Sequence, residues 1–392
     1  MKIGLLGHGT IGIGVDHLVK TMNGMEVTKI LSLVTDDEMA GREASGIDEI
    51  VGDPEIDTVV EVMGGIHPAY EFITAAMKEK KNVVTANKAV VAACYRELNA
   101  LAKENGVSFR ATASVGGGIP WLTALEKKRC VDEIAGLYGI MNGTTNYILS
   151  TMEESIDGTG ALKAQAVTFE EALKRAQELG YAEKDPTADI DGFDVRRKVT
   201  ISANVAYGVV LDEESVPTFG IRTVCLSDLQ EALRKNCTVR LIAEAKREEG
   251  GIAAAVFPAF VKKDSEEGNV RANFNLFTLC GKCTGEFKFY GQGAGRYPTA
   301  GNVVSDLEDI RQRHPGFYTD EFADAKVVYD SSEAVYYVRT GKPDRFLKEN
   351  TVEIAANSAV FTKPLAGDVF LPWALQKRRE DPGFFAAKIF SS

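Results

Sequence analysis

Short apolar runs rich in β-branched residues alternate with segments of helical periodicity near the start of the chain. The apolar runs predict β-strands at residues 2–6, 27–34, 58–63, 82–85 and 107–109. Residues 68–80 and 89–105 have the pattern typical of the helices that connect such strands. Because crossovers between parallel strands are right-handed, the alternation predicts an α/β domain with a doubly wound sheet.

The pattern changes after residue 115, where glycines precede a proline. A helix is expected from Pro120, because proline suits the first helical turn. Residues 134–141 are typical of a strand, and residues 168–179 and 191–207 are typical of helices. Further strands are expected at residues 238–245, 252–260, 273–280 and 284–290. Strands grouped together with helices beside them predict an α+β second domain.

Composition narrows the class of protein. The 392 residues carry 45 Lys+Arg and 56 Asp+Glu, a net charge of −11, which argues against a nucleic-acid partner. Every apolar run is shorter than the roughly 18 residues that span a bilayer, and Gly7 interrupts any signal-peptide core. The six scattered cysteines fit a reducing compartment. We therefore expect a cytoplasmic protein with no membrane partner.

A glycine-rich loop follows the first expected strand, with the sequence GHGTIG at residues 7–12. In the GxGxxG pattern, the first glycine makes a tight turn and the second lets the backbone approach a pyrophosphate. The third lets the helix and the strand pack closely, and the helix N-terminus faces the phosphates. Inside a βαβ unit the loop predicts a Rossmann dinucleotide-binding domain, with His8 facing solvent. By itself, the same hexapeptide is also typical of a plain glycine-rich turn.

Four further segments follow this loop in a fixed order: VVTANK at residues 83–88, NGTTNY at 142–147, GYAEKDPTADIDGFDVRRK at 180–198 and GQGAGRYPTA at 291–300. With them the sequence resembles the homoserine dehydrogenases over about residues 1–312. The resemblance implies NAD(P)-dependent interconversion of L-homoserine and L-aspartate 4-semialdehyde, in threonine, methionine and isoleucine biosynthesis. The alternatives are a dehydrogenase for another small amino-acid carbonyl, or a non-catalytic nucleotide-binding paralogue.

The resemblance also implies a domain organisation. We expect a dinucleotide-binding domain at residues 1–128, onto which a helix near 299–312 packs back. A substrate-binding and dimerisation domain is expected at residues 129–312. Residues 313–392 are expected to form a small C-terminal appendage, for which a divergent ACT-like module is one interpretation. A homodimer or homotetramer is expected.

Acidic and basic side chains concentrate around the start of the helix expected at residues 191–207. Asp194 and Lys198 stand at i and i+4 on one helical face, and Asp191 lies near the same stripe. A zwitterionic substrate needs carboxylates for its ammonium group, and a lysine near carboxylates can move the proton of an alcohol. By spacing alone, the pair is also typical of a surface salt bridge, with Arg197 as an alternative partner of Asp194.

The roles implied by the resemblance extend to several segments. The implied catalytic residues are Lys198, as the acid/base group, and Lys88. The implied substrate ligands are Glu183, Asp189 and Asp194. The implied cofactor-binding residues are Gly7, Gly9, Thr10, Ile11, Gly12, Asp36, Gly64, Lys88, Gly180, Glu183 and Gly295.

The sequence departs from the family pattern at an expected cation site. The family usually binds a monovalent cation with a glutamate and the backbone carbonyls of the next loop, but Thr112 stands at the position of the glutamate. Losing a carboxylate weakens a site for a hard cation by charge as well as by ligand count. We therefore expect only weak cation binding, through the backbone oxygens of Val115, Gly117 and Ile119.

Cofactor preference depends on the end of the second strand, where an acidic residue binds ribose hydroxyls and an arginine would bind a 2′-phosphate. Asp36 and Asp37 follow the strand expected at residues 27–34, and no arginine occurs before Arg42. This charge pattern slightly favours NAD over NADP. In the alternative, the aspartates only cap a turn and Arg42 binds the phosphate.

Overall fold

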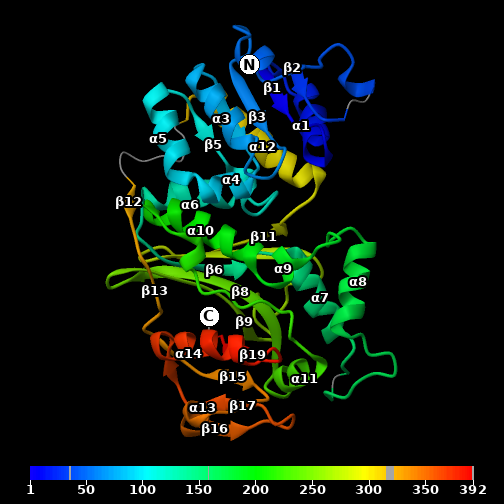
Figure 1. The fold of residues 1–392 in the computed structure, drawn as a ribbon, viewed down its shortest axis with the longest axis vertical. Helices are drawn as coiled ribbons and strands as arrows, with labels where there is room; N and C mark the ends of the chain where they lie inside the picture. The colour runs from blue at the N-terminus through cyan, green and yellow to red at the C-terminus, as the bar shows by residue number, and fades with distance from the viewer. Residues whose placement is uncertain (35–36, 158, 315–321, 391–392) are drawn as a thin grey trace. The chain divides into compact units, whose positions relative to one another are not determined.

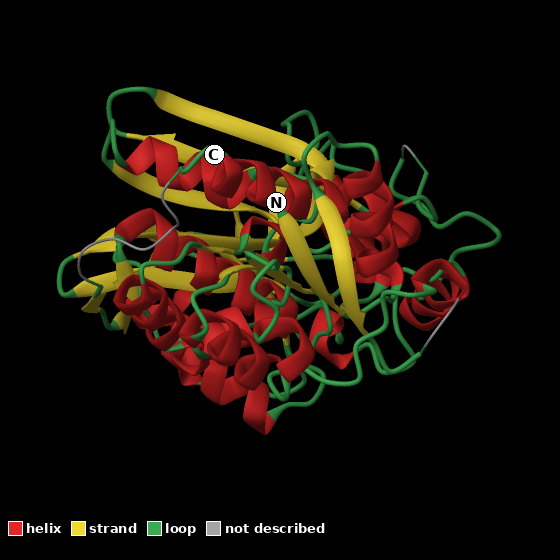
Figure 2. Ribbon diagram, turned by 90° about the horizontal axis from the view of Figure 1, so that it is seen from above, coloured by secondary structure: helices red, strands yellow, loops and turns green. Residues whose placement is uncertain are grey.

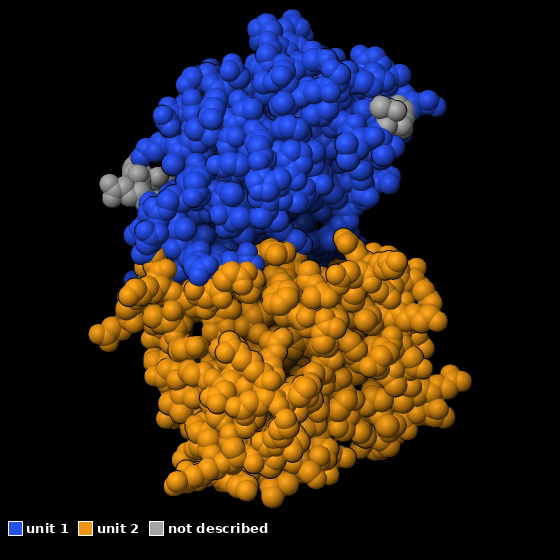
Figure 3. Space-filling model, in the orientation of Figure 1, with its two compact units in different colours: residues 1–134, 200–213, 291–324 blue, residues 135–199, 214–290, 325–392 orange. Residues whose placement is uncertain are grey.

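The computed structural model describes residues 1–34, 37–157, 159–314 and 322–390. The chain divides into two compact units, which are coloured separately in Figure 3. Unit 1 comprises Met1–Ile134, Thr200–Glu213 and Gly291–Asp324, and unit 2 comprises Ala135–Val199, Glu214–Tyr290 and Ala325–Ser392. In both units, loops connect helices and strands (Figure 2). The domain boundaries expected from the sequence stay predictions.

Unit 1 contains a five-stranded parallel sheet (Figure 1). Its strands are β1 (Lys2–Leu6), β2 (Glu26–Leu31), β3 (Thr58–Glu61), β4 (Asn82–Thr85) and β5 (Phe109–Arg110). The strand order is β2-β1-β3-β4-β5, so the chain changes its direction of winding at β1. Ligands of such sheets bind where the order reverses, outside the carboxyl ends of the strands. The α/β class and the five strands are confirmed, although β2 ends three residues earlier than expected.

Seven α-helices accompany this sheet in the described part of unit 1: α1 (Thr10–Lys20), α2 (Asp48–Val51), α3 (Ala69–Lys78), α4 (Lys88–Ala93), α5 (Tyr95–Asn105), α6 (Trp121–Arg129) and α12 (Arg296–Arg311). The helix expected at residues 89–105 is two helices, because the backbone leaves the helical region at Cys94 (φ −123°, ψ 28°). On α12, Val303 and Leu307 are buried in one apolar cluster with Ile3 of β1 and Val15 of α1. A helix from late in the sequence thus completes the core beside the glycine-rich loop.

A mixed sheet of ten strands forms the centre of unit 2 (Figure 1). Its first strands are, in spatial order, β11 (Gly285–Gln292), β10 (Phe274–Gly281), β6 (Ile134–Ile140), β8 (Cys237–Glu248) and β9 (Gly251–Lys262). β8 and β9 pair antiparallel along their whole length, from Cys237 opposite Lys262 to Glu248 opposite Gly251. The five strands expected between residues 134 and 290 are therefore confirmed, and β8 and β9 extend beyond their predicted ends.

C-terminal strands continue the same sheet. They are β15 (Tyr336–Arg339), β16 (Thr351–Ile354), β17 (Val360–Thr362) and β19 (Phe385–Ile389), and β13 (Val327–Val328) also pairs with β9. β19 runs parallel to β9, with Ile389 opposite Phe260. Helices α13 (Arg345–Asn350) and α14 (Gly367–Glu380) accompany these strands, and Phe370 of α14 stacks on Tyr336 at 3.6 Å between ring centres. The C-terminal residues thus share their core with β9.

The helices that carry the candidate chemistry are α7 (Gly143–Glu153), α8 (Phe169–Glu178), α9 (Thr187–Ile190), α10 (Phe193–Tyr207) and α11 (Leu226–Arg234). Thr168 and Glu171 form a capping box that begins α8, as expected for a helix from residue 168. α10 begins two residues later than expected, because Asp191 caps the end of α9 and Gly192 has a φ of +85°. None of the helices in the described ranges has both the length and the apolar character needed to cross a membrane.

Candidate active site

Asn142 links three of the elements in unit 2. As the N-cap of α7, it accepts a hydrogen bond from the backbone N–H of Thr145 through its side-chain oxygen (2.8 Å). Its amide nitrogen donates to Asp189 of α9 (2.7 Å) and to Asp194 of α10 (2.8 Å). Both partners are carboxylate oxygens, so the nitrogen must face them. Asn142 therefore holds two carboxylates beside the start of α7.

Lys198 completes this arrangement from the next turn of α10. Its Nζ lies 2.8 Å from Oδ2 of Asp194 and donates to the carbonyl oxygen of Met141 over 2.7 Å. Lys198 is only 7% exposed and Asp194 only 2% exposed, so the pair is buried rather than a surface salt bridge. A buried charge pair is costly unless its geometry and hydrogen bonds compensate, and such pairs are frequent at functional sites. We call Asn142, Asp189, Asp194 and Lys198, with the Met141 carbonyl, the lysine cluster.

Two acidic residues expected nearby lie outside the lysine cluster. Asp191 forms a two-hydrogen-bond ion pair with Arg222, at 2.7 and 2.8 Å, so it does not share the stripe of Asp194 and Lys198. Glu183 is exposed on the loop between α8 and α9, and within the described residues its carboxylate makes no contact with the cluster. Gly180, with a φ of +74°, lets the chain turn after α8 into this loop.

The loop containing Glu183 is tied to α7 at another point. Thr144 donates its hydroxyl to the carbonyl oxygen of Tyr181 (2.6 Å), and the rings of Tyr147 and Tyr181 meet edge to face at 5.1 Å. These contacts join residues from the segments at 142–147 and 180–198. The two segments that the sequence analysis singled out are therefore neighbours in unit 2.

The glycine-rich loop lies at the carboxyl end of β1 in unit 1. Gly7 has a φ of +100°, and a Cβ at Gly12 would lie 2.1 Å from the carbonyl oxygen of Gly7, so neither position accepts a larger residue without distortion. Gly9 precedes α1, whose first residues are Thr10 and Ile11. This geometry leaves the N-terminus of α1 ready for a phosphate.

His8 does not face solvent, contrary to the prediction. It is only 6% exposed, and its Nε2 lies 3.9 Å from Oδ2 of Asp16 on α1. The loop sequence does not indicate this burial, because it depends on the His8 side chain turning toward the helix that begins just after it. His8 is therefore a packing residue between the loop and α1.

Another buried polar group, Glu61, ends β3, and the sequence analysis missed it. Glu61 is fully buried and accepts hydrogen bonds from the Thr85 hydroxyl (2.6 Å) and the Met63 backbone N–H (2.8 Å). Burial raises the pKa of Glu61, although these hydrogen bonds lower it. Because β3 and β4 are parallel neighbours, their carboxyl ends place Glu61 and Thr85 together at the edge of the sheet where cofactors bind.

Asn87 and Lys88 follow Thr85 after a single residue, Ala86. Asn87 caps α4 by accepting from the backbone N–H groups of Ala89 and Val90, and its amide donates to the carbonyl oxygen of Gly65 (2.6 Å). Lys88 is the first residue of α4 and is half-buried. Gly64, with a φ of +85°, lies in the same loop after β3. The cap thus fixes the position of the Lys88 backbone relative to the ends of β3 and β4.

The residues of the expected cation site lie in the loop at 112–119. Thr112 donates its hydroxyl (2.6 Å) and its backbone N–H (2.9 Å) to the buried carboxylate of Asp306 on α12. The carbonyl oxygens of Gly117 and Ile119 both accept hydrogen bonds from the side-chain amide of Asn302, also on α12. Val115 is fully buried. Gly295, with a φ of +123°, caps the start of α12.

Arg42, the alternative partner for a 2′-phosphate, is already paired. Its Nη1 and Nη2 donate to the two oxygens of Asp16, at 2.6 and 2.9 Å, and Nη2 also donates to the carbonyl oxygen of Glu38. Lys20 adds a second cation at 2.8 Å from Asp16. Asp36, the residue expected to bind the ribose, lies outside the described residues.

Comparisons with known proteins agree with this geometry. Residues 7–111 match the family model described as the NAD-binding domain of homoserine dehydrogenase, and residues 120–307 match the homoserine dehydrogenase model itself. A homoserine dehydrogenase from Bacillus subtilis is 39% identical over 322 residues, which cover 78% of this chain and 72% of the relative. The chain belongs to the homoserine dehydrogenase family. It is accordingly an NAD(P)-dependent oxidoreductase.

Two further homoserine dehydrogenases extend the match toward the C-terminus. The relative from Lactococcus lactis is 35% identical over 367 residues, covering 88% of this chain and 83% of that protein. The crystal structure of the enzyme from Thiobacillus denitrificans superposes with a TM-score of 0.85 at 30% identity, covering 100% of this chain and 98% of the other. The α/β fold of this homoserine dehydrogenase, predicted from the sequence, is confirmed.

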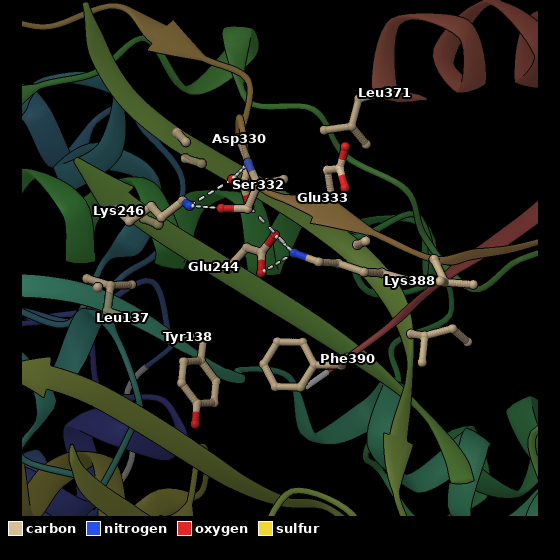
Figure 4. Close-up of a pocket in the computed structure, with 18 of the residues that line it drawn as sticks. Leu137, Tyr138, Glu244, Lys246, Asp330, Ser332, Glu333, Leu371, Lys388 and Phe390 are labelled. Atoms are coloured by element: carbon tan, nitrogen blue, oxygen red, sulfur yellow. Dashed lines mark hydrogen bonds and ion pairs between the residues drawn. The ribbon is translucent and has the colours of Figure 1, made fainter. Parts of the chain in front are cut away.

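One cavity of unit 2 lies away from the lysine cluster. It measures about 530 Å³ and is lined by β8, β9 and C-terminal residues. Figure 4 shows Lys246 pointing toward Asp330 and Lys388 toward Glu244, each pair 2.7 Å apart. None of the residues that line this cavity belongs to the lysine cluster. The cavity and the lysine cluster are therefore separate features of this homoserine dehydrogenase.

Proposed function

We propose that this homoserine dehydrogenase interconverts L-homoserine and L-aspartate 4-semialdehyde with Lys198 as the acid/base residue. The observation that carries the proposal is the buried lysine held at 2.8 Å by Asp194 and at 2.7 Å by the Met141 carbonyl. Oxidation of an alcohol requires a group that removes the hydroxyl proton, and reduction of the aldehyde requires one that returns it. The nicotinamide cofactor, when bound, takes up or supplies the hydride.

The partners of Lys198 suit both directions of proton transfer. Asp194 stabilises the charged ammonium that forms when Lys198 takes a proton, and the Met141 carbonyl orients Nζ without adding charge. A group that is fixed by two partners loses little freedom when it reacts, which favours catalysis by orientation. Lys198 is therefore proposed to take the proton in homoserine oxidation and to return it in semialdehyde reduction.

Substrate recognition is proposed to use the carboxylates beside this lysine. Asn142 brings the carboxylates of Asp189 and Asp194 together, and carboxylates are the groups that bind the ammonium group of an amino acid. Glu183 extends the acidic character on the adjoining loop. Lys88 is proposed to act toward both the cofactor and the substrate from the start of α4.

For the cofactor, we propose that NAD is used at least as well as NADP. The bidentate pairing of Arg42 with Asp16 supports this preference, because a 2′-phosphate would have to compete with a buried carboxylate for the same guanidinium. Binding is proposed to use the glycine-rich loop with Asp36, Gly64, Gly180, Glu183 and Gly295. A homodimeric or homotetrameric state and a cytoplasmic location stay predictions, the first testable by light scattering.

One assay tests the proposal. NAD⁺ and NADP⁺ reduction is measured with L-homoserine and, in parallel, with L-serine and L-threonine as other hydroxy amino acids. We expect kcat/KM to be highest for L-homoserine and at least as high with NAD⁺ as with NADP⁺. Preference for another hydroxy amino acid would contradict the substrate, and no turnover with any of them would favour a nucleotide-binding paralogue. A tenfold preference for NADP⁺ would contradict only the cofactor assignment.

A further inference from the structure

Asn302 bridges two backbone carbonyls of the loop at residues 115–119. Its Nδ2 donates to the oxygen of Gly117 and, over 2.9 Å, to the oxygen of Ile119. Both partners are acceptors, so only the nitrogen end of the amide can face them, and its two hydrogens serve one oxygen each. Asn302 is 6% exposed, so this bridge is buried within unit 1.

The bridged loop is closely packed on its other sides. Gly117 has a φ of +54°, and a Cβ there would lie 2.6 Å from the carbonyl carbon of Gly293. The backbone N–H of Gly118 donates to Gln292, and that of Ile119 donates to Gly116. The loop therefore has a fixed conformation, in which the oxygens of Gly117 and Ile119 converge on the same amide.

Helix α12 also contacts Thr112, which stands at the position of the family's glutamate ligand. Asp306 stands at i+4 from Asn302, on the same face of α12, and accepts two hydrogen bonds from Thr112. Arg110 donates to Asp306 over 3.1 Å, and its Nη2 lies 2.7 Å from Asp309. The negative charge of Asp306 is thus balanced by a built-in guanidinium. The residues present do not fit a monovalent cation, because Thr112 replaces the glutamate and two of the three expected backbone oxygens, those of Gly117 and Ile119, already bind the Asn302 amide.

We propose that the Asn302 amide takes the place of the monovalent cation in this loop, so that the enzyme needs no particular alkali cation. The inference rests on the proposed function only for its kinetic readout. The positive ends of two N–H dipoles point at the oxygens that would bind the ion. An ion shared by those oxygens would have to approach alongside these hydrogens, which repel it. The amide therefore supplies partial positive charge and a cross-link between the two oxygens, in place of those that an ion would supply.

The test compares wild type with two variants in choline, sodium or potassium chloride at one ionic strength. Melting temperature and kcat/KM for L-homoserine are both measured. For wild type we expect the same melting temperature, within about 1 °C, and the same kcat/KM, within twofold, in all three salts. Asn302→Ala should lower the melting temperature by a few degrees in every salt, because two buried carbonyls lose their donor.

Asn302→Asp sharpens the test, because it places a carboxylate oxygen against two carbonyl oxygens at nearly constant shape. We expect this variant to melt several degrees lower in choline and to recover selectively in sodium or potassium. Asn23→Asp adds the same charge at an exposed turn and should show no salt-specific recovery.

Three outcomes would overturn the proposal. The first is a salt-specific change in wild type, of more than 3 °C in melting temperature or more than fivefold in kcat/KM. The second is an unchanged melting temperature in Asn302→Ala. The third is a folded Asn302→Asp protein whose melting temperature responds equally to all salts. If Asn302→Asp does not fold, wild type and Asn302→Ala still decide. Absence of homoserine turnover in every salt would refute the proposed function, whereas the melting temperatures would still test the role of Asn302.

Discussion

Asp194 and Asp228 are both buried aspartates of unit 2 that face a basic side chain, but the two basic side chains differ. Asp228 of α11 receives Nε and Nη2 of Arg339 at 2.8 and 2.9 Å, together with the hydroxyl of Tyr337 at 2.8 Å. Asp194 faces the ammonium group of Lys198 and accepts a hydrogen bond from the side-chain amide of Asn142. The first pair joins α11 to β15. The second pair lies within α10, and Asn142 links it to the start of α7.

The two pairs differ in whether the basic side chain can release its proton. An arginine does not lose its proton in proteins, and its planar fork suits two parallel hydrogen bonds to a carboxylate. Burial lowers the pKa of the Arg339 guanidinium, but hydrogen bonds and charge from Asp228 outweigh burial and raise it. A lysine ammonium is a point charge that can give up its proton. Unit 2 thus has an arginine where two segments are tied together and a lysine where the proposed chemistry moves a proton.

The largest effect is expected from Arg339→Ala. It would leave the Asp228 carboxylate buried without its cation, which costs about 3–5 kcal/mol in comparable pairs. We expect a clearly lower melting temperature, with kcat per folded molecule unchanged at low temperature. Arg345→Ala removes an exposed arginine that pairs with Glu349, and it should leave the melting temperature unchanged. If the two variants melt alike, the Arg339 pair has no special structural role.

Asp194→Asn tests the pair formed by Asp194 and Lys198. It keeps the shape but removes the charge beside Lys198, so kcat/KM for L-homoserine should fall by about 10²-fold, a typical acid–base contribution. Asp191→Asn is the matched control, because Asp191 lies three residues away and pairs with Arg222. Its kcat/KM should stay within about twofold of wild type, because the charge beside Lys198 is unchanged in this variant. Equal losses in both variants would show that the effect follows from a general loss of negative charge.

Glu183→Gln should have a smaller effect, because the Glu183 side chain is exposed. We expect KM for L-homoserine to rise by less than about tenfold, with kcat nearly unchanged, since an exposed charge is well solvated. Steady-state kinetics at low and high salt measures this effect. A fall in kcat as large as that of Asp194→Asn would place Glu183 in the catalytic step.

The pH dependence of stability provides the smallest effect, at Glu126 beside Arg110 in unit 1. Burial raises the pKa of Glu126 to about 7 from 4.5, although the charges of Arg110 and Arg129 lower it. The folded protein therefore holds a proton that the unfolded chain releases. Protonation of Glu126 contributes on the order of 1 kcal/mol to the free energy of unfolding. This contribution is fully present below about pH 4.5 and is lost as the pH rises through 7. Glu126→Gln should flatten this trend between pH 5.5 and 8 in thermal melts.

Much of the fold follows from local patterns in the sequence. The strands of the first sheet and the strands of the second sheet up to residue 292 were predicted because alternation and β-branched runs report burial directly, whereas the C-terminal strands of the second sheet were not predicted. The glycine-rich loop was predicted because Gly7 and Gly12 satisfy a steric requirement that no other residue meets. The i, i+4 spacing of Asp194 and Lys198 predicted their shared face. Spacing could not show that the pair is buried, because burial depends on elements distant in the sequence.

The parts that the sequence analysis missed depend on such distant contacts. Asn142 reaches Asp189 and Asp194 across some fifty residues, and the sequence analysis included it in the segment at 142–147 without giving it a role. Asn302 meets the loop at 115–119 only because α12 returns to unit 1. Asparagines near a glycine-rich segment can be found in a sequence, but their burial and their partners are known only from the fold.

The most direct test of the movable proton is Lys198→Ala, assayed with L-homoserine under saturating cofactor. We expect kcat to fall by at least about 10²-fold, while dinucleotide affinity, measured by fluorescence titration, stays the same. Lys174→Ala removes an exposed lysine of α8 and should match wild type in both measurements. Near-normal turnover in a folded Lys198→Ala protein would contradict the assignment of Lys198 as the acid/base residue.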